Sequence, residues 1–218
     1  MPKQFDLLVF DWDGTLMDSA GAIAFSIQAA SRDVGLAVPS ESEARHIIGL
    51  GLNEAVAALF PKLPLSGYEA LVDRYRHYYL AQNADIPLFN GAAETIAALH
   101  EEGFLLAVAT GKGRRGLDNV LEQTGLGQYF HTSRCTDECF SKPHPCMLIE
   151  IMDILNVPRS RTLMIGDTSH DLQMAINAGV RSVGVSYGAH PKESLLDFAP
   201  LMCADSFVEL QQWLNDNA

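Results

Sequence analysis

Short apolar runs recur along the chain, and stretches in which apolar residues follow helical spacing separate most of them. The apolar runs cover residues 5–10, 104–110, 162–166 and 181–186. Almost continuous apolar runs are typical of strands buried on both faces of a parallel sheet. The helical spacings cover residues 91–102, 113–124, 143–156 and 169–178. This alternation predicts an α/β protein with a doubly wound, mostly parallel sheet.

The alternation is interrupted after the first apolar run by a long segment with helical patterns only. A proline and a glycine in residues 84–92 indicate where the chain returns to the sheet. We therefore expect an α/β core domain made of residues 1–15 and 86–218. Residues 16–85 are expected to form a helical cap domain inserted into it.

The composition favours a soluble globular protein that remains in the cytoplasm, as a monomer or a homodimer. The 218 residues are 48% hydrophobic, yet no run approaches the roughly 18 apolar residues of a membrane span. The first residues also lack the basic start and apolar core of a signal peptide. Fifteen basic residues against 27 acidic ones give a formal net charge of −12, which disfavours nucleic acid as a partner.

The four cysteines are too sparse for a small secreted domain held together by disulfides, so we expect reduced thiols. Cys135, Cys139 and His144 are close in sequence and are potential zinc ligands. Their spacing matches no closed structural zinc site, and no second pair follows. The sequence therefore predicts no zinc site.

Polar residues follow three of the predicted strands at their carboxyl ends. Asp11 and Asp13 follow the first, Thr110 and Gly111 follow the second, and Asp167 follows the run at 162–166. Ligands of open α/β sheets bind outside these ends, near the point where the strand order reverses. A single Asp-X-Asp pattern is also common in turns and helix caps. Three strand ends with polar groups instead indicate a binding site.

A divalent cation is the expected partner of the acidic residues at this rim. Asp171 follows Asp167 by one helical turn and adds a further carboxylate. Crowded carboxylates raise one another's pKa unless positive charge is present. Oxygen ligands without histidine or cysteine favour Mg²⁺, which usually meets a phosphate at such sites.

The remaining polar groups of the rim suit a phosphate. Thr110 offers a hydroxyl, and Lys142 offers a positive charge at the start of a predicted helix with Pro143 in its first turn. Lys142 is also consistent with a solvated surface lysine, in which case Lys112 could take its role. The residues alone leave both alternatives open.

Four ordered segments are similar to the motifs of a known family. They are residues 11–18 (DWDGTLMD), 109–112 (ATGK), 141–145 (SKPHP) and 166–171 (GDTSHD). Together with the long helical insertion they resemble haloacid dehalogenase-like hydrolases that have a helical cap and a Rossmann-like core. The overall pattern is most similar to phosphoglycolate phosphatase-like members, and the resemblance covers nearly the whole chain.

The resemblance implies a role for each residue of the rim. Asp11 would be the nucleophile that forms an aspartyl-phosphate, and Asp13 would be the general acid and then the base. Mg²⁺ would be held by Asp11, the backbone carbonyl of Asp13 and Asp167, with Asp171 orienting this shell. The phosphoryl oxygens would be stabilised by the phosphate-binding residues Thr110, Gly111 and Lys142.

The implied activity is Mg²⁺-dependent hydrolysis of a small phosphomonoester, such as phosphoglycolate or a sugar phosphate. Asp13 favours this over halide displacement or carbon–phosphorus cleavage, because the relatives with those activities lack the second aspartate. A pyrophosphatase, a nucleotidase, a sugar-phosphate mutase and a noncatalytic phosphate-binding module are the alternatives. The intact pair of Asp11 and Asp13 disfavours the binding module, which needs no nucleophile.

Residues around this site carry further expectations. Arg45, His46 and Asn53 of the cap are candidate contacts for the leaving group of the substrate. Trp12 is expected to pack beside the turn rather than to touch substrate. Asp18 and Ser19 are expected to start the first cap helix, in an N-cap role.

Overall fold

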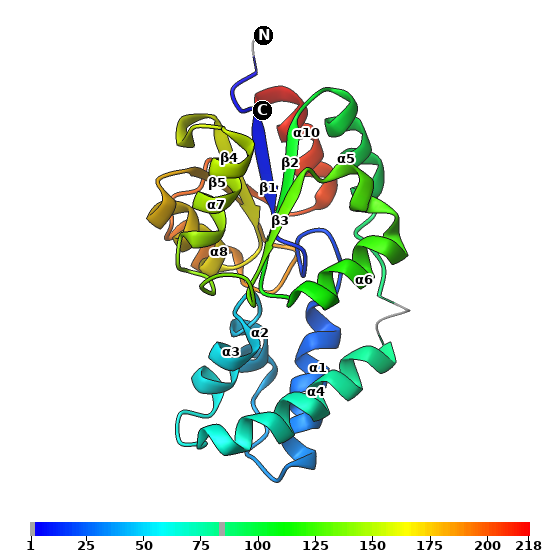
Figure 1. Ribbon diagram of the computed structural model, residues 1–218, viewed down its shortest axis with the longest axis vertical. Helices are drawn as coiled ribbons and strands as arrows, with labels where there is room; N and C mark the ends of the chain where they lie inside the picture. The colour runs from blue at the N-terminus through cyan, green and yellow to red at the C-terminus, as the bar shows by residue number, and fades with distance from the viewer. Residues whose placement is uncertain (1–2, 83–85) are drawn as a thin grey trace.

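The computed structural model describes residues 3–82 and 86–218. The predicted cap boundary at residue 85, and the first part of the predicted return segment, lie outside the described residues. Across the described residues, six parallel strands form one sheet in the order β3-β2-β1-β4-β5-β6 (Figure 1). The strands are β1 (Leu7–Phe10), β2 (Leu105–Thr110), β3 (Thr132–Cys135), β4 (Thr162–Gly166), β5 (Arg181–Val185) and β6 (Cys203–Ala204). The predicted doubly wound parallel sheet is confirmed.

The helices fall into two groups along the chain. The first group, which we call the cap helices, comprises α1 (Ala20–Asp33), α2 (Glu41–His46), α3 (Leu52–Leu59) and α4 (Tyr68–Gln82). The second group comprises α5 (Ala92–Glu101), α6 (Arg114–Thr124), α7 (Cys146–Leu155), α8 (Ser169–Ala178), α9 (Lys192–Leu196) and α10 (Phe207–Asn217). Short 3₁₀ turns are η1 (Leu65–Gly67), η3 (Leu126–Tyr129) and η4 (Arg159–Arg161). None of the helices in the described ranges is long and apolar enough to cross a lipid bilayer.

Alternate residues of the central strand face the two apolar layers of the core. Leu8 and Phe10 belong to the cluster that contains residues of α5, α6 and α10. Leu7 and Val9 belong to the cluster formed with α7 and α8. Side chains alternate in this way along any strand, so an almost continuous apolar run can fill both layers at once.

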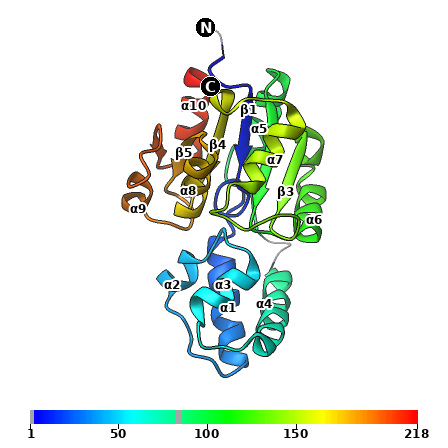
Figure 2. The ribbon, with the colours of Figure 1, turned by 60° about the vertical axis from the view of Figure 1, so that its left-hand side comes forward.

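The cap helices lie together beyond the carboxyl ends of the strands, at the opposite end of the molecule from the two termini (Figures 1 and 2). The chain enters and leaves them through two adjacent segments. Met17 forms an antiparallel bridge with Leu88, and the amide of Phe89 donates to the carbonyl of Leu16 at 2.9 Å. The chain therefore connects the cap helices to the sheet through two neighbouring segments.

Three local predictions are wrong. Neither β3 nor β6 was predicted, because Thr132–Cys135 has no apolar run and β6 has only two residues. Helix α7 begins at Cys146, so Pro143 is not in its first turn and Lys142 precedes the helix by four residues.

Candidate active site

The polar strand ends meet where the strand order reverses. Strand β1 lies between β2 and β4, and the three strands run parallel. Asp11, Thr110 and Asp167 stand at or just beyond the carboxyl ends of these neighbouring strands. The predicted convergence on one rim is confirmed, because parallel neighbours must end at the same edge of the sheet.

A buried cluster of carboxylates occupies this rim. Oxygen atoms of Asp11, Asp167 and Asp171 all lie within 4.8 Å of one another. The Nζ of Lys142 lies 2.8 Å from Oδ1 of Asp11 and 2.6 Å from Oδ1 of Asp171, and its side chain is inaccessible to solvent. The described residues offer no hydrogen-bond or ion-pair partner to Oδ2 of Asp11. This oxygen is therefore open to a ligand as far as the described residues show.

The cluster holds more negative charge than its single lysine can balance. Burial raises the pKa of Asp11 to about 7, against the lowering effect of Lys142, and Asp171 adds to the rise. Burial also raises the pKa of Asp167 well above its usual value, with contributions from Asp11 and Asp171. Burial lowers the pKa of Lys142, but the two carboxylates outweigh it and raise the value overall. The lysine therefore stays charged, and the cluster would be stabilised by further positive charge.

Asp167 is fixed in orientation through both carboxylate oxygens. Oδ1 accepts a hydrogen bond from the hydroxyl of Thr15 at 2.9 Å, and Oδ2 accepts one from the amide of Ala189 at 2.7 Å. Gly14 allows the close approach of the loop after β1. Its φ is +83°, and a Cβ atom there would lie 2.1 Å from Oδ2 of Asp167. Only glycine satisfies both conditions.

Asp171 has two functions at the start of α8. Its Oδ2 accepts hydrogen bonds from the amide and the hydroxyl of Thr168, which closes a capping box at the helix N-terminus. Its Oδ1 pairs with Lys142. The capping box thus fixes Asp171, Asp171 positions Lys142, and Lys142 in turn orients Asp11.

Asp13 is held by contacts from both the core and the cap helices. Its Oδ1 accepts a hydrogen bond from the hydroxyl of Ser19 at 2.6 Å and lies 2.9 Å from Nζ of Lys112. The same Nζ donates to the hydroxyl of Tyr79, on α4, at 2.8 Å. Burial raises the pKa of the Tyr79 phenol, and the charge of Asp13 adds to the rise. Tyr79 therefore stays protonated and joins a cap helix to the Asp13 carboxylate through Lys112.

Ser19 stands at the start of the first cap helix as predicted, but it does not cap that helix with its side chain. Ser19 occupies the N-cap position of α1, but its side chain makes no capping hydrogen bond and bonds Asp13 instead. Asp18 is exposed and takes no part in the carboxylate cluster.

Thr110 and Gly111 lie where the core meets the loop between α2 and α3. The hydroxyl of Thr110 accepts a hydrogen bond from the amide of Lys112 at 3.2 Å. A Cβ atom at Gly111 would lie 2.6 Å from the carbonyl oxygens of both Gly49 and Leu50. Glycine is therefore needed here for the loop of the cap to approach the rim.

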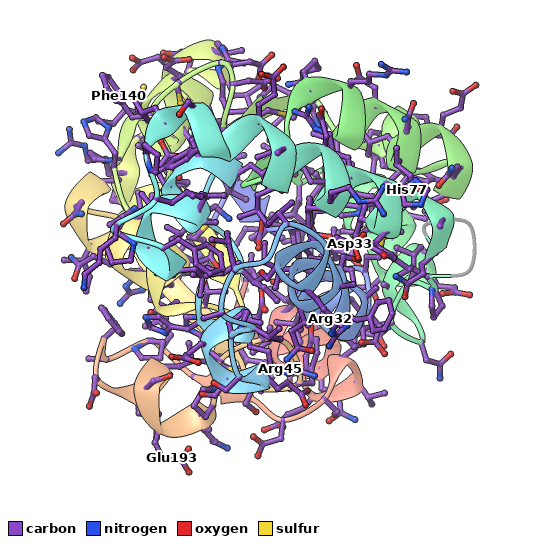
Figure 3. All side chains as sticks on the ribbon, turned by 90° about the horizontal axis from the view of Figure 1, so that it is seen from below. Arg32, Asp33, Arg45, His77, Phe140 and Glu193 are labelled. Carbon is purple, nitrogen blue, oxygen red and sulfur yellow. The ribbon has the colours of Figure 1, made fainter. Side chains whose placement is uncertain are left out.

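The three predicted leaving-group contacts lie in different places. Asn53 lines the cavity between the cap helices and the strand ends. Arg45, labelled on α2 in Figure 3, does not line that cavity. Its guanidinium instead donates to Glu41 and to the carbonyl of Gly188. The imidazole of His46 does not line the cavity either, and stacks on His190 with ring centroids 5.1 Å apart.

The cysteines form a different group from the one considered in the sequence. Cys139, Cys146 and Glu150 have potential ligand atoms within 4.8 Å of one another, without Cys135 or His144. Cys146 donates to Glu150, which also binds the guanidinium of Arg134 at 2.6 Å. The Glu150 carboxylate in this group is thus shared between a thiol donor and a guanidinium.

Several residues around the site were missed by reasoning from the sequence. Thr15, Ser19 and Tyr79 contact the carboxylates or Lys112, and Lys112 was considered only as a substitute for Lys142. Thr15 and Ser19 follow Asp11 closely, which was a usable signal. Tyr79 is far away in sequence, so only the fold reveals its contact. Trp12 is fully buried and packs edge-on against Phe130, as expected of a packing residue.

Comparisons with known proteins agree with this geometry. The sequence pattern of the family described as "Haloacid dehalogenase-like hydrolase" matches residues 8–185. The chain is 34% identical over 210 residues to "Probable phosphatase IndB" of Dickeya dadantii (strain 3937), covering 94% of this chain and 91% of that one. It is 31% identical over 219 residues to a phosphoglycolate phosphatase of Vibrio vulnificus (strain YJ016), covering 95% of each chain. A crystal structure described as a predicted phosphatase from Clostridium acetobutylicum superposes with a TM-score of 0.86 at 25% identity, covering 98% of this chain and 100% of that one.

The fold, the carboxylate cluster and these matches define the class of the protein. The chain belongs to the haloacid dehalogenase-like hydrolase family. The two relatives compared above are named a probable phosphatase and a phosphoglycolate phosphatase, and the expectation of a phosphoric monoester hydrolase is confirmed at this level.

Proposed function

We propose that the protein is a Mg²⁺-dependent phosphatase that hydrolyses a small phosphomonoester through an aspartyl-phosphate on Asp11. One observation carries the proposal. Asp11 is buried, its Oδ1 is held by Lys142 at 2.8 Å, and its Oδ2 has no partner among the described residues. A fixed carboxylate with one free oxygen is what nucleophilic attack on phosphorus requires.

In the first step, Oδ2 of Asp11 bonds to phosphorus and the bond from phosphorus to the ester oxygen breaks. Asp13 gives its proton to the departing oxygen. In the second step Asp13 takes a proton from water, which attacks phosphorus and releases inorganic phosphate and the Asp11 carboxylate. Ser19 and Lys112 both contact Oδ1 of Asp13 and hold its orientation through the two steps.

The carboxylate cluster fits a magnesium ion. Asp11 and Asp167 supply oxygen atoms within 4.8 Å of each other, and the excess negative charge calls for a cation. We assign Asp11, the backbone carbonyl of Asp13 and Asp167 to the ion, with Asp171 positioned behind them. When bound, the ion would supply positive charge to the phosphoryl oxygens and to the Asp11 carboxylate.

The remaining charge on the transferring group would be met by Thr110, the amide of Gly111 and Lys142. The amine of Lys142 is fully buried at the base of the site, and Asp11 and Asp171 keep it protonated. A fixed cation costs no reorganisation when charge develops on the phosphoryl oxygens. We assign residues 1–15 and 86–218 to the chemistry, and residues 16–85 to leaving-group recognition.

The proposal is tested by following phosphate release from phosphoglycolate and from simple alkyl phosphates. Asp11→Asn should lower turnover at least about a thousandfold, whereas Asp18→Asn, an exposed change in the same stretch, should retain it. EDTA should abolish activity and Mg²⁺ should restore it. Substantial turnover by Asp11→Asn would contradict the covalent mechanism, and full activity in EDTA would contradict the assignment of the metal.

A further inference from the structure

A large cavity lies between the cap helices and the strand ends. Its volume is about 740 Å³, and Asp11, Asp13 and Thr110 line it at the sheet side. This volume is within the range of about 300–1,000 Å³ that holds drug-sized ligands. A phosphoryl group with a short acid such as glycolate would leave most of this space unfilled.

The cap side of the cavity is mainly apolar. Its walls come from four elements, namely α1, the loop between α2 and α3, helix α3, and α4. The aliphatic side chains that line it include Ile23, Ile27, Ile47, Ile48, Leu52 and Val72. Such a surface favours an apolar ligand, because contact with one removes water from both surfaces.

Two tyrosines of α4 give the cavity a flat aromatic wall. The rings of Tyr75 and Tyr79 are stacked, with centroids 5.8 Å apart and an interplanar angle of 16°. Both line the cavity, and the hydroxyl of Tyr79 is already engaged by Lys112. The two rings meet face to face, and Nζ of Lys112 lies 4.7 Å from the centroid of the Tyr79 ring. The aromatic surface offered to a ring of the ligand is therefore that of half-buried Tyr75.

The charges of the cavity do not favour a carboxylate in the leaving group. Among the described residues that line it, the cationic side chains are Lys112, Arg76 and Arg115. Lys112 is paired with Asp13, whereas Arg76 and Arg115 are exposed to solvent. A carboxylate in the apolar part would therefore lose its hydration without gaining a buried cationic partner.

We propose that the natural substrate is a phosphomonoester of a bulky, mainly apolar alcohol that contains a ring, and that Tyr75 determines this specificity. The ring packs against the aromatic wall while the phosphoryl group reaches Asp11. This inference rests on the proposed phosphatase function and refines it. It departs from phosphoglycolate, the substrate that the names of several relatives indicate.

The test is a series of phosphate esters of primary alcohols, so that the acidity of the leaving alcohol changes little along it. Ethyl, butyl, cyclohexylmethyl and 3-phenylpropyl phosphate are compared with phosphoglycolate by phosphate release from the unaltered protein. We expect kcat/KM to rise at least about tenfold from ethyl to 3-phenylpropyl phosphate, with phosphoglycolate near the bottom. A flat series, or phosphoglycolate at the top, would overturn the inference and leave the phosphatase function intact. No turnover of any ester would overturn the phosphatase function, and the inference with it.

A pair of variants on the same helix locates the effect. Tyr75→Ala should lower the ratio of kcat/KM for 3-phenylpropyl phosphate to that for ethyl phosphate about tenfold. Tyr78→Ala should keep the ratio, because Tyr78 does not line the cavity and bonds Asp33 on the outer part of α1. If Tyr75→Ala does not fold, Ile47→Ala makes the same measurement from another wall. An unchanged ratio in a folded variant would contradict the assigned specificity.

Discussion

The hydroxyl of Tyr79, on cap helix α4, accepts a hydrogen bond of 2.8 Å from Nζ of Lys112, which itself lies 2.9 Å from Asp13. The Tyr79 side chain of α4 thus contacts Lys112, and Lys112 contacts the proposed acid Asp13. The position of α4 over the strand ends and the orientation of Asp13 are therefore connected through Lys112.

This link predicts a selective effect of Tyr79→Phe. The change removes one hydroxyl and leaves Lys112 paired with Asp13, so kcat should fall about three- to tenfold, which corresponds to the loss of one hydrogen bond. The melting temperature should change little. Tyr78→Phe, which loses a hydroxyl bonded to exposed Asp33, is the matched control and should retain kcat. Equal kcat values for the two variants would show that the contact has no role in turnover.

Lys142→Met should destabilise the fold as well as stop turnover. The change leaves Asp11 and Asp171 buried without their shared cation, and breaking a buried ion pair typically costs on the order of 3 kcal/mol. The free energy of unfolding, measured by urea denaturation in EDTA, reports the effect. Lys192→Met removes an exposed lysine paired with Asp205 and should alter stability little. A stable Lys142→Met protein would mean that the buried charge is dispensable for folding.

Gly111→Ala should push the loop between α2 and α3 away from the rim. The new Cβ atom would lie 2.6 Å from two carbonyl oxygens of that loop, which is too close for any carbon atom. We expect a lower melting temperature and a fall in kcat/KM of about tenfold or more, because small misplacements near the reacting groups have large effects. Gly21→Ala, in α1, has no atom within 4 Å of the new Cβ and serves as the control. Unperturbed kinetics in Gly111→Ala would contradict close contact of the loop in solution.

Acid should weaken the contact between α2 and the core through His190. Burial, together with His170 and His46, lowers the pKa of His190 from 6.5 to about 4. Its Nδ1 accepts from the amide of Ser169, and its Nε2 donates to the carbonyl of His46, so the fold holds the neutral ring.

The sign of the pH effect follows from this depressed pKa. Between pH 6.5 and pH 4 the unfolded chain binds the additional proton, so stability falls as the pH falls. From pH 7 to pH 5 this histidine should lower the free energy of unfolding by about 2 kcal/mol. Urea denaturation at both values measures it, and His190→Asn, which keeps an acceptor near the Ser169 amide, should reduce the difference. An identical pH dependence in the variant would exclude His190 as its source.

The parts of the fold predicted from the sequence are those with a local cause. The strand that ends at Phe10 is buried on both faces and therefore shows as a continuous apolar run. Helix α8 has the predicted bounds because Thr168 and Asp171 form a capping box at its start and Gly179 ends it in the left-handed conformation. Strand β3 lies at the edge of the sheet and is half-buried over three of its four residues, so its sequence shows no apolar run.

The residues of the candidate site likewise fall into those that the sequence could predict and those that it could not. Asp11 and Asp167 could be predicted together, because their strands end at the same rim. The burial of Lys142 could not, since it depends on how the segment before α7 directs this side chain toward Asp11 and Asp171. The contact of Tyr79 with Lys112 depends on how α4 lies over the core. No periodic pattern within a single segment carries that information.

The bridge between Met17 and Leu88 has a further consequence for how such a protein can change over evolutionary time. Because the outgoing and returning chain segments are neighbours, everything between them is an insertion cassette that the parallel sheet does not depend on for its own strand pairing. Exchange of the cassette would bring a new leaving-group chamber to the same aspartates. The new cassette would have to supply the contacts that Ser19 makes with Asp13 and that Tyr79 makes with Lys112.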